Sequence, residues 1–464
     1  MSEKKDRLYS RIILIAVIIF YGFFAFYDGA VICVDSPSYI DMTISREFLY
    51  PTLLAVFRSI AGEEYLLWIV VFQSLLTAYI TWNVTIYFKK QFSLNNIVTT
   101  GIAFVFVAVS LLNRFVAGRG SMYSNSIMTE GITIPLFLLF FRYLYEYLVT
   151  RTGRALAIAA ALAGILIAIR KQMYVALALL FLVVIYVQIK KYVDNKNLNF
   201  KKWLLTIGRA CILCGGLVLA VTLMDHTYNY IVRGKFVGHA SDSRFVLTTV
   251  MYTSEAEYAE KLPDELQPLF MDIYSECDQQ GFLMHSAGEG WYNNVSHFGD
   301  YYDRIQIDTM CPAIRDYAEM YSSNYTEIEL MTDDITNVMI KSLLPSTAPR
   351  IIKVLFNNLL SGMVTTVAQR NRILIWYSLA AYIGYVGLLL YYRKSVGRSD
   401  RVVKLCLLTL VSIVINVGLV SAVIFCQTRY TIYNMPLFYN SAIILLWNLY
   451  RQHKISLRLK KKEE

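Results

Sequence analysis

The sequence predicts an all-α polytopic membrane protein with about ten transmembrane helices. Of its 464 residues, 56% are apolar and only 17% are charged, whereas a soluble domain is about 45–50% apolar and about 25% charged. The apolar residues gather in runs of roughly 20, the length that a helix needs to cross a hydrocarbon core of ~30 Å. The predicted spans are 12–28, 65–88, 97–112, 127–149, 155–169, 173–189, 203–224, 373–392, 403–425 and 434–450.

The first run, at 12–28, is expected to stay in the protein as a helix, because it lacks a small-residue cleavage site and keeps aromatic flanks. Lys and Arg then predict the side of each connection. Counting alternately from the N-terminus, every connection of one set is basic, namely those at 4–11, 89–90, 151–154, 190–202 and 393–401 and the C-terminal tail. That set is expected to be cytoplasmic, with both termini, in a multi-pass protein of the plasma membrane.

The net charge of +10 is therefore mostly a property of the inner membrane surface, and it gives no reason to expect nucleic acid as a partner. The same alternation predicts three parts. Residues 1–224 form an N-terminal transmembrane module whose first exterior loop, 34–62, holds the candidate catalytic residue. Residues 225–369 form an exterior, mostly helical segment. Residues 370–464 form a C-terminal transmembrane module with a basic cytoplasmic tail.

Within the exterior segment, apolar residues at three- and four-residue spacing predict helices at 255–280 and 332–344, the second with Thr332 and Asp333 as its N-cap. The Gly-, Asn- and Tyr-rich stretch 288–303 is expected to be a loop, and 350–364 an amphipathic helix on the outer membrane surface. Cys277 and Cys311 could pair.

The first exterior loop begins with "VDSPSYIDM", which places Asp35 and Asp41 where a bland turn would suffice. Asp41 is six residues further on, about 240° around if the loop is helical. The two acids are therefore not expected to face one cavity, and Asp41 is expected to be solvated or to cap a helix.

Several exterior connections are basic, against the orientation rule. They hold Arg114 and Arg119, Arg170 and Lys171, Arg370 and Arg372, and Arg429 with Tyr430. For any single one of these basic residues, charge balance and contact with lipid headgroups explain its position as well as a bound ligand does. Several short basic loops on one side fit a shared anionic ligand at the membrane surface, such as a lipid-linked phosphate. Arginine suits that ligand because its planar fork binds phosphate oxygens at two points.

Asp35 then has a chemical use. If a sugar is attached to the lipid phosphate, the leaving group is already acidic and needs no proton from the protein. Transfer needs one carboxylate as general base for the incoming hydroxyl and cations for the departing phosphate. No His or Cys cluster predicts a metal site. A divalent cation held by Asp35 with other exterior acids is an alternative, and no further cofactor is implied.

Four stretches carry a further signal: "DSPSYIDMTISREFLYPTLLAVF", "SIMTEGITIPLFLLF", "IAIRKQMYVAL" and "TRYTIYNMPLFY". Together they resemble the GT-C glycosyltransferases, polytopic enzymes that use polyprenyl-phosphate sugars, including the dolichyl-phosphate-mannose-dependent mannosyltransferases. "DSPSYIDMTISREFLYPTLLAVF" resembles their first exterior loop, with Asp35, Tyr39 and Arg46 at the matching positions, although Phe48 stands near where a proline is common. "SIMTEGITIPLFLLF" resembles their Thr-Glu element, "IAIRKQMYVAL" an Arg-bearing outer turn, and "TRYTIYNMPLFY" an Arg-Tyr element. The residues at the matching positions are Thr129 and Glu130, Arg170, and Arg429 and Tyr430.

The resemblance implies an inverting transfer with Asp35 as base. The sugar comes from a polyprenyl-phosphate donor and goes to a glycan, lipid or protein acceptor on the exterior face. Arg170 and Arg429, with Lys171, would hold the lipid phosphate, and Glu130 either caps a helix or contacts substrate. Three alternatives remain: a polymerase or ligase of lipid-linked glycans, a flippase, and a non-catalytic assembly or receptor protein.

Overall fold

The structure is a computed structural model that describes residues 3–463 except 117–119, 196–198, 241 and 398. The described chain is helical, with one isolated β-bridge between Val31 and Ser126 and no strand. Long helices coincide with all ten predicted spans. They are α1 (Glu3–Tyr27), α4 (Tyr65–Phe92), α5 (Asn96–Val116), α6 (Glu130–Thr150), α7 (Gly153–Ile169), α8 (Tyr174–Asp194), α9 (Phe200–Arg233), α15 (Arg372–Val396), α16 (Arg401–Val423) and α18 (Met435–Glu463).

Eight stretches of the described residues are long and apolar enough to cross a membrane, and they contain α1, α4, α5, α6, α8, α9, α15 and α16. Of the other two predicted spans, α7 is shorter, with 17 residues, and α18 continues into a polar C-terminal half. The chain is thus a polytopic α-helical membrane protein, and the predicted fold class is confirmed at that level.

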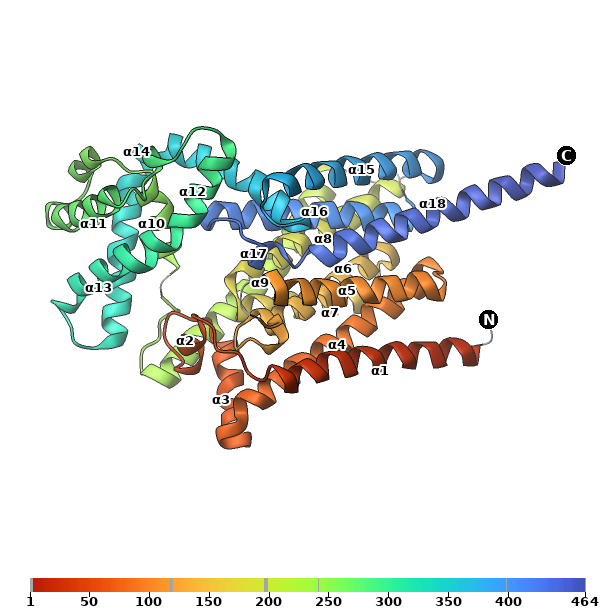
Figure 1. Cartoon of the computed structure of the whole chain (residues 1–464), viewed down its shortest axis with the longest axis horizontal. Helices are drawn as coiled ribbons and strands as arrows, with labels where there is room; N and C mark the ends of the chain where they lie inside the picture. The colour runs from red at the N-terminus through yellow and green to blue at the C-terminus, as the bar shows by residue number, and fades with distance from the viewer. Residues whose placement is uncertain (1–2, 117–119, 196–198, 241, 398, 464) are drawn as a thin grey trace.

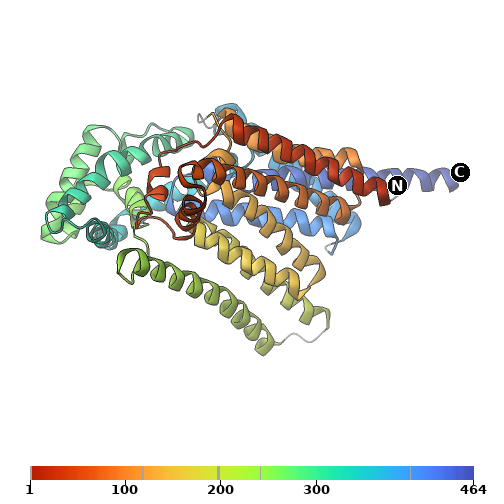
Figure 2. The ribbon, with the colours of Figure 1, turned by 90° about the horizontal axis from the view of Figure 1, so that it is seen from below.

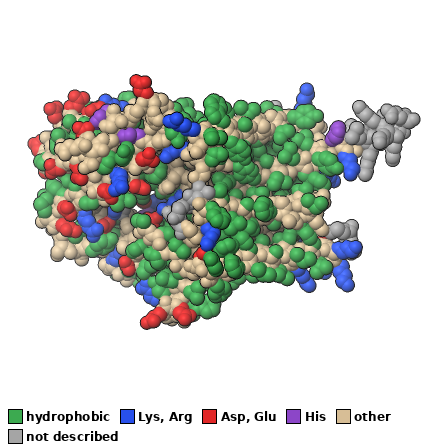
Figure 3. Space-filling model, in the orientation of Figure 1, with side chains coloured by type: hydrophobic (Ala, Val, Ile, Leu, Met, Phe, Trp, Pro, Cys, Tyr) green, Lys and Arg blue, Asp and Glu red, His purple; other side chains and the backbone are tan. Residues whose placement is uncertain are grey.

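The long helices run side by side along the long axis, with the start of α1 and the end of α18 at the same end (Figure 1). Apolar side chains cover the middle of the molecule, whereas most acidic side chains gather on the end away from the termini (Figure 3). Burial differs strongly between helices: 61% of the apolar window of α6 is buried, but only 17% of that of α9. Figure 2 shows α9 along the outside of the bundle, so its apolar surface is left to face lipid.

The end away from the termini is formed by the polar lobe, which we define as residues 234–367. It contains α10 (Ser243–Tyr252), η4 (Ala256–Lys261), η5 (Asp264–Leu266), α11 (Gln267–Gln279), η6 (Met284–Ser286), α12 (Trp291–Asp303), the π-helix η7 (Arg304–Met310), α13 (Cys311–Glu319) and α14 (Tyr325–Val367). It has a core of its own around Phe270, Tyr302 and Met339. The lobe is therefore a packed unit rather than a set of long loops.

Two expectations for this segment were wrong. The loop expected at 288–303 is largely α12, because Val295, Phe298 and Tyr302 bury one helical face in the core of the lobe. The N-cap expected at Thr332 and Asp333 lies inside α14, whose N-cap is Asn324.

The residues expected to form a helix at 350–364 are helical. They belong to the 43-residue α14, which continues through two prolines. Exposed Ile352, Phe356 and Leu360 do give it an apolar stripe, so its place on the membrane surface stays a prediction. Cys277 and Cys311 are both free thiols.

Short elements connect the bundle to the lobe. They are α2 (Ser36–Ile40), α3 (Leu49–Ala61), η1 (Gly62–Glu64), η2 (Tyr123–Asn125), η3 (Lys171–Met173) and α17 (Thr428–Thr431). In Figure 1, α2 and α17 lie between the long helices and the lobe. These short elements and the residues next to them carry Asp35, Tyr39, Arg46, Arg170, Lys171, Arg429 and Tyr430, whereas Glu130 begins α6, Arg114 lies in α5 and Arg372 begins α15.

Candidate active site

The loop after α1 is tied to the segment before α6. Val31 forms the bridge with Ser126, and its amide donates to the Asn125 carbonyl over 2.9 Å. The buried Ser36 hydroxyl donates to the Ile127 carbonyl over 2.8 Å and accepts from the amide of Cys33. Asp35 directly precedes Ser36, so these bonds fix its position opposite the start of α6.

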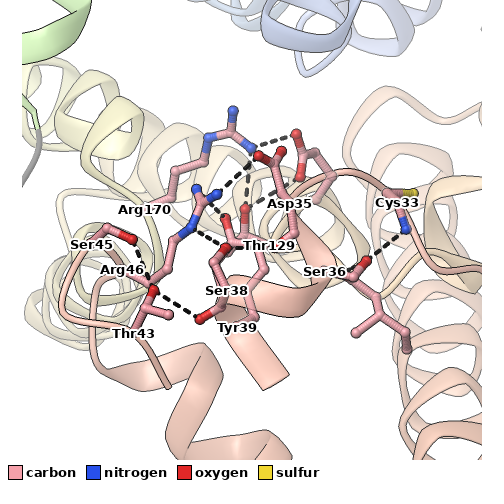
Figure 4. A network of polar contacts seen from close by, with 12 residues as sticks. Cys33, Asp35, Ser36, Ser38, Tyr39, Thr43, Ser45, Arg46, Thr129 and Arg170 are labelled. Atoms are coloured by element: carbon pink, nitrogen blue, oxygen red, sulfur yellow. Dashed lines mark hydrogen bonds and ion pairs between the residues drawn. The ribbon is translucent and has the colours of Figure 1, made fainter. Parts of the chain in front are cut away.

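Asp35 stands at the N-cap of α2, but its side chain makes no capping bond. Its two oxygens bind different arginines: Arg46 donates to Oδ1 over 2.9 Å, and Arg429 donates to Oδ2 over 2.6 Å. Arg46 is itself held by Ser38, whose hydroxyl oxygen accepts from Nε over 2.7 Å (Figure 4). Asp41, by contrast, is exposed at the C-cap of α2, as expected.

Glu130, the first residue of α6, is the second acid of the cluster, and its side chain is fully buried. Arg170 forms an ion pair with it at 2.5 Å and donates to the Thr129 hydroxyl over 3.1 Å. Arg429 also donates to Glu130 through Nε. Arg429 therefore bridges both acids, joining Asp35 and Glu130 through one guanidinium group.

The two tyrosines of the resemblance lie against these arginines. Arg46 stacks over the ring of the buried Tyr39 at 4.5 Å, and Arg170 stacks over the ring of Tyr430 at 5.3 Å. A planar guanidinium group on an aromatic face gains cation–π attraction. Tyr39 and Tyr430 therefore orient the arginines, and they also give the cluster apolar walls.

We call these five side chains (Asp35, Arg46, Glu130, Arg170 and Arg429) the ion cluster. Three arginines (+3) and two carboxylates (−2) leave it a net charge of +1. Exposure falls from 25% at Asp35 and 23% at Arg46 to 13% at Arg170 and 0% at Glu130. The cluster thus opens on the Asp35 side and is closed behind Glu130.

Electrostatics keep Asp35 ionised. Burial acts to raise the pKa of the Asp35 carboxyl, but the positive charges of Arg429 and Arg46 outweigh it, and the pKa is lowered from its usual value. Burial acts against the charge of Arg429 too, yet Glu130, Tyr430 and Asp35 raise the pKa of that guanidinium well above its usual range. Asp35 and Arg429 are therefore both charged at neutral pH.

Buried amides that sequence reasoning missed hold the cluster from behind. Gln73 of α4 accepts from the Tyr50 hydroxyl over 3.0 Å and donates to the carbonyls of Ser124 and Ser126, so it fixes the segment leading to Glu130.

The Tyr430 carbonyl accepts from Gln172 over 2.7 Å and from Asn416 over 3.0 Å, which holds α17 in place. Amides within apolar spans are costly unless they are hydrogen-bonded. In the sequence, Gln73 in "VVFQSLL" and Asn416 in "SIVINVGL" are amides within apolar runs, and this pattern could have marked them as buried hydrogen-bonding residues.

The other predicted exterior basic residues lie elsewhere. Lys171 turns away from the ion cluster and forms an ion pair with Asp242. Arg114 pairs with Asp28 at the end of α1. Arg370 donates to a carbonyl of α12, and Arg372 stacks on Tyr292. Arg119 lies outside the described residues.

A cavity of about 40 Å³ lies beside Glu130, between α1, α4, α5 and α6. A larger one, of about 420 Å³, lies in the polar lobe against α12 and α14 and contains no member of the cluster. Among the described residues, no group of three His, Cys, Asp or Glu side chains could hold a metal ion.

No protein-family model and no curated protein matches the chain. Among solved structures, it aligns with the crystal structure of ArnT from Cupriavidus metallidurans bound to undecaprenyl phosphate, over 94% of this chain and 76% of that one. The sequence identity is 10% and the TM-score is 0.30. A TM-score this low is below what a shared fold gives, so the case for a function rests on the geometry of the site.

Proposed function

We propose that the protein is a membrane glycosyltransferase of the GT-C type, which moves a sugar from a polyprenyl-phosphate carrier to an acceptor hydroxyl on the exterior face. One observation carries the proposal: Asp35 and Arg429 are 394 residues apart in sequence, yet their side chains meet at 2.6 Å between the bundle and the lobe. Arg170 joins them through Glu130. Two arginines would be enough to balance the charges of two acids. The third arginine adds a positive charge that suits an anionic ligand.

A lipid phosphate suits this place for two reasons. The cluster has a net charge of +1, which one phosphodiester charge neutralises. Glu130 begins a membrane-length helix, so a phosphate held beside it would lie at headgroup depth, with its polyprenyl tail in hydrocarbon. Arg170 and Arg429 would bind the phosphate oxygens through their forks.

The chemistry needs one base. The acceptor oxygen attacks the anomeric carbon from the side opposite the phosphate, and the acceptor proton passes to an oxygen of Asp35. The bond between the anomeric carbon and the phosphate oxygen breaks, and its electron pair leaves with the lipid phosphate. The product is inverted, because the new bond forms on the face opposite the old one.

Arg429 couples the two halves of this step. Before transfer, Asp35 carries a negative charge and shares the guanidinium with Glu130. After transfer, Asp35 is neutral and the departing phosphate has gained a charge. The guanidinium can then interact with the phosphate at the moment when charge develops there, which is where a preorganised cation lowers a barrier most.

The test is sugar transfer by purified protein supplied with a radiolabelled polyprenyl-phosphate sugar and exterior membrane acceptors. Asp35→Asn keeps the shape of the side chain but removes the base, and we expect a loss of 10²-fold or more, roughly the share that general-base catalysis provides. Asp41→Asn, six residues away on an exposed cap, should transfer normally. Near-normal turnover by folded Asp35→Asn protein would refute the assignment.

A further inference from the structure

One acid of the polar lobe lies near the ion cluster and has no hydrogen-bond or ion-pair partner in the described part of the chain. It is Asp303, the last residue of α12. The preceding residue, Tyr302, is buried against the connection between α16 and α17, where its ring lies 5.1 Å from that of Phe425. Its hydroxyl donates to the Phe245 carbonyl of the lobe over 2.7 Å. Phe425 is four residues before Arg429. Packing thus holds the end of α12 above the segment that carries Arg429.

Asp303 makes no hydrogen bond or ion pair with any described residue, and its side chain is exposed. Burial by the surrounding elements nevertheless raises the pKa of its carboxyl, the negative charge of Asp35 raises it further, and Arg429 acts in the opposite direction. Asp303 therefore lies within electrostatic reach of both residues. The carboxyl of Asp303 is thus partly shielded by neighbouring protein, while the residue stays open to solvent.

The backbone at this point is also unusual. The π-helix η7 begins at Arg304, directly after Asp303, and continues to Met310. Such segments are rare and occur frequently at functional sites. The neighbouring arginine does not neutralise Asp303, since Arg304 pairs with Asp308 at 2.8 Å. Asp303 therefore has no ion-pair partner among the described residues, at the point where α12 passes into the π-helix.

We propose that Asp303 binds the acceptor, accepting a hydrogen bond from a second hydroxyl of the group whose reacting hydroxyl gives its proton to Asp35. This inference rests on the proposed function and adds a substrate class to it. The acceptor end is a neutral polyol with neighbouring hydroxyls, as in a glycan unit, and not a phosphate or carboxylate.

The charges support that class. An ionised carboxylate can only accept hydrogen bonds, so Asp35 and Asp303 both suit hydroxyl donors. Two acids on the acceptor side would repel an anionic acceptor, while the arginines face the lipid phosphate. The lobe thus contributes directly to the reaction site, instead of only covering it.

The experiment uses the full-length protein in detergent with a radiolabelled polyprenyl-phosphate sugar as donor and octyl β-glucoside as the acceptor probe. We expect Asp303→Asn to raise the KM for octyl β-glucoside about tenfold, the loss of one hydrogen bond to a charged group, with kcat changed little. Asp303→Glu should recover part of the affinity. Binding of polyprenyl phosphate alone should not weaken, because a nearby negative charge is removed.

The matched control is Asp308→Asn, which changes an exposed acid five residues further on, in the π-helix that follows Asp303, where it is the partner of Arg304. It should behave as wild type. A wild-type acceptor KM in Asp303→Asn, or an equal rise in Asp308→Asn, would overturn the inference. Wild-type protein that transfers to its membrane acceptors but not to octyl β-glucoside would overturn the neutral-polyol class. Wild-type protein that does not bind polyprenyl phosphate would refute the proposed function itself.

Discussion

The two ends of α6 each carry an acid paired with arginine, but the two sites differ in construction. At one end, buried Glu130 pairs with Arg170 and Arg429, which lie 40 and 299 residues away in sequence. Toward the other end, Glu146 pairs with Arg142 of the same helix at 3.1 Å, with 27% and 16% of their side chains exposed. Arg142 also stacks on Tyr143 at 4.1 Å.

This difference separates a structural ion pair from a candidate binding site. The Arg142–Glu146 pair is balanced, one charge against one, and lies within one helix, so it stabilises only that helix and its neighbours. The ion cluster has more positive than negative charge and is assembled from four separate segments. Only the second arrangement leaves a cation free to exchange its partner for a ligand.

The largest contrast should appear in stability. Glu130→Gln leaves two buried arginines with one counter-charge fewer, and we expect a loss of about 3–5 kcal/mol in the free energy of unfolding. Glu146→Gln breaks a partly exposed pair and should lose about 1 kcal/mol or less. Unfolding of both variants in the same detergent gives the comparison. Equal losses would mean that the ion cluster is no more than another local pair.

Ligand binding should sharpen the same contrast. Arg429→Lys keeps the charge but loses the fork, and we expect polyprenyl phosphate to bind roughly 10- to 100-fold more weakly, as hydrogen bonds to a charged group imply. Arg142→Lys is the same substitution at the other end of α6 and should bind as wild type. Equilibrium binding of the radiolabelled lipid measures both. Unchanged affinity in Arg429→Lys would count against a phosphate role for Arg429.

Packing behind the cluster gives a smaller effect. A Cβ atom at Gly131 would lie 2.6 Å from Cδ of Gln73, which cannot move without breaking its bonds to Tyr50 and Ser124. We expect Gly131→Ala to cost about 1–3 kcal/mol. Gly153, at the start of α7, has open space, and Gly153→Ala should be neutral or stabilise by about 0.4–1 kcal/mol. A tolerated alanine at 131 would show that Gln73 is not a rigid support.

The smallest effect concerns pH. The pKa of Asp35 is lowered in the folded protein, so its stabilising contribution is present above the usual Asp range and is lost as the pH falls through the folded pKa. The pKa of Asp303 is raised, so its ionisation costs stability once the pH exceeds the folded value. At neutral pH, Asp35→Asn should therefore destabilise and Asp303→Asn should stabilise. Unfolding midpoints of both variants should approach wild type at strongly acidic pH, and shifts of the same sign at pH 7 would contradict this pair of directions.

Much of the fold could be predicted from hydropathy and charge, because each span needs only its own residues to be apolar. The polar lobe could not be predicted in the same way. The helix α12 has the Gly and Asn content of a loop, and it is helical because Val295, Phe298 and Tyr302 pack in the core. Tertiary packing here overrides propensity.

The site was partly predictable for a similar reason. Asp35, Glu130, Arg170 and Arg429 stood out as charges at helix ends on one side, and the structure brings them together. The sequence could not show that the Lys171 side chain pairs with Asp242 instead of joining the ion cluster. Arg170 has extended backbone, with φ −160° and ψ 126°, and neighbouring side chains on extended backbone point to opposite sides. Asp303 could not be foreseen either, since its place depends on the packing of Tyr302.

The central claim is that the ion cluster binds the lipid phosphate by exchanging its partners, and a structure of the protein with polyprenyl phosphate tests it most directly. We expect the phosphate oxygens to lie within hydrogen-bond distance of both Arg170 and Arg429, with the bond from Arg429 to Asp35 broken. A bound lipid whose phosphate lies away from these arginines, with all the ion pairs of the cluster intact, would contradict the account.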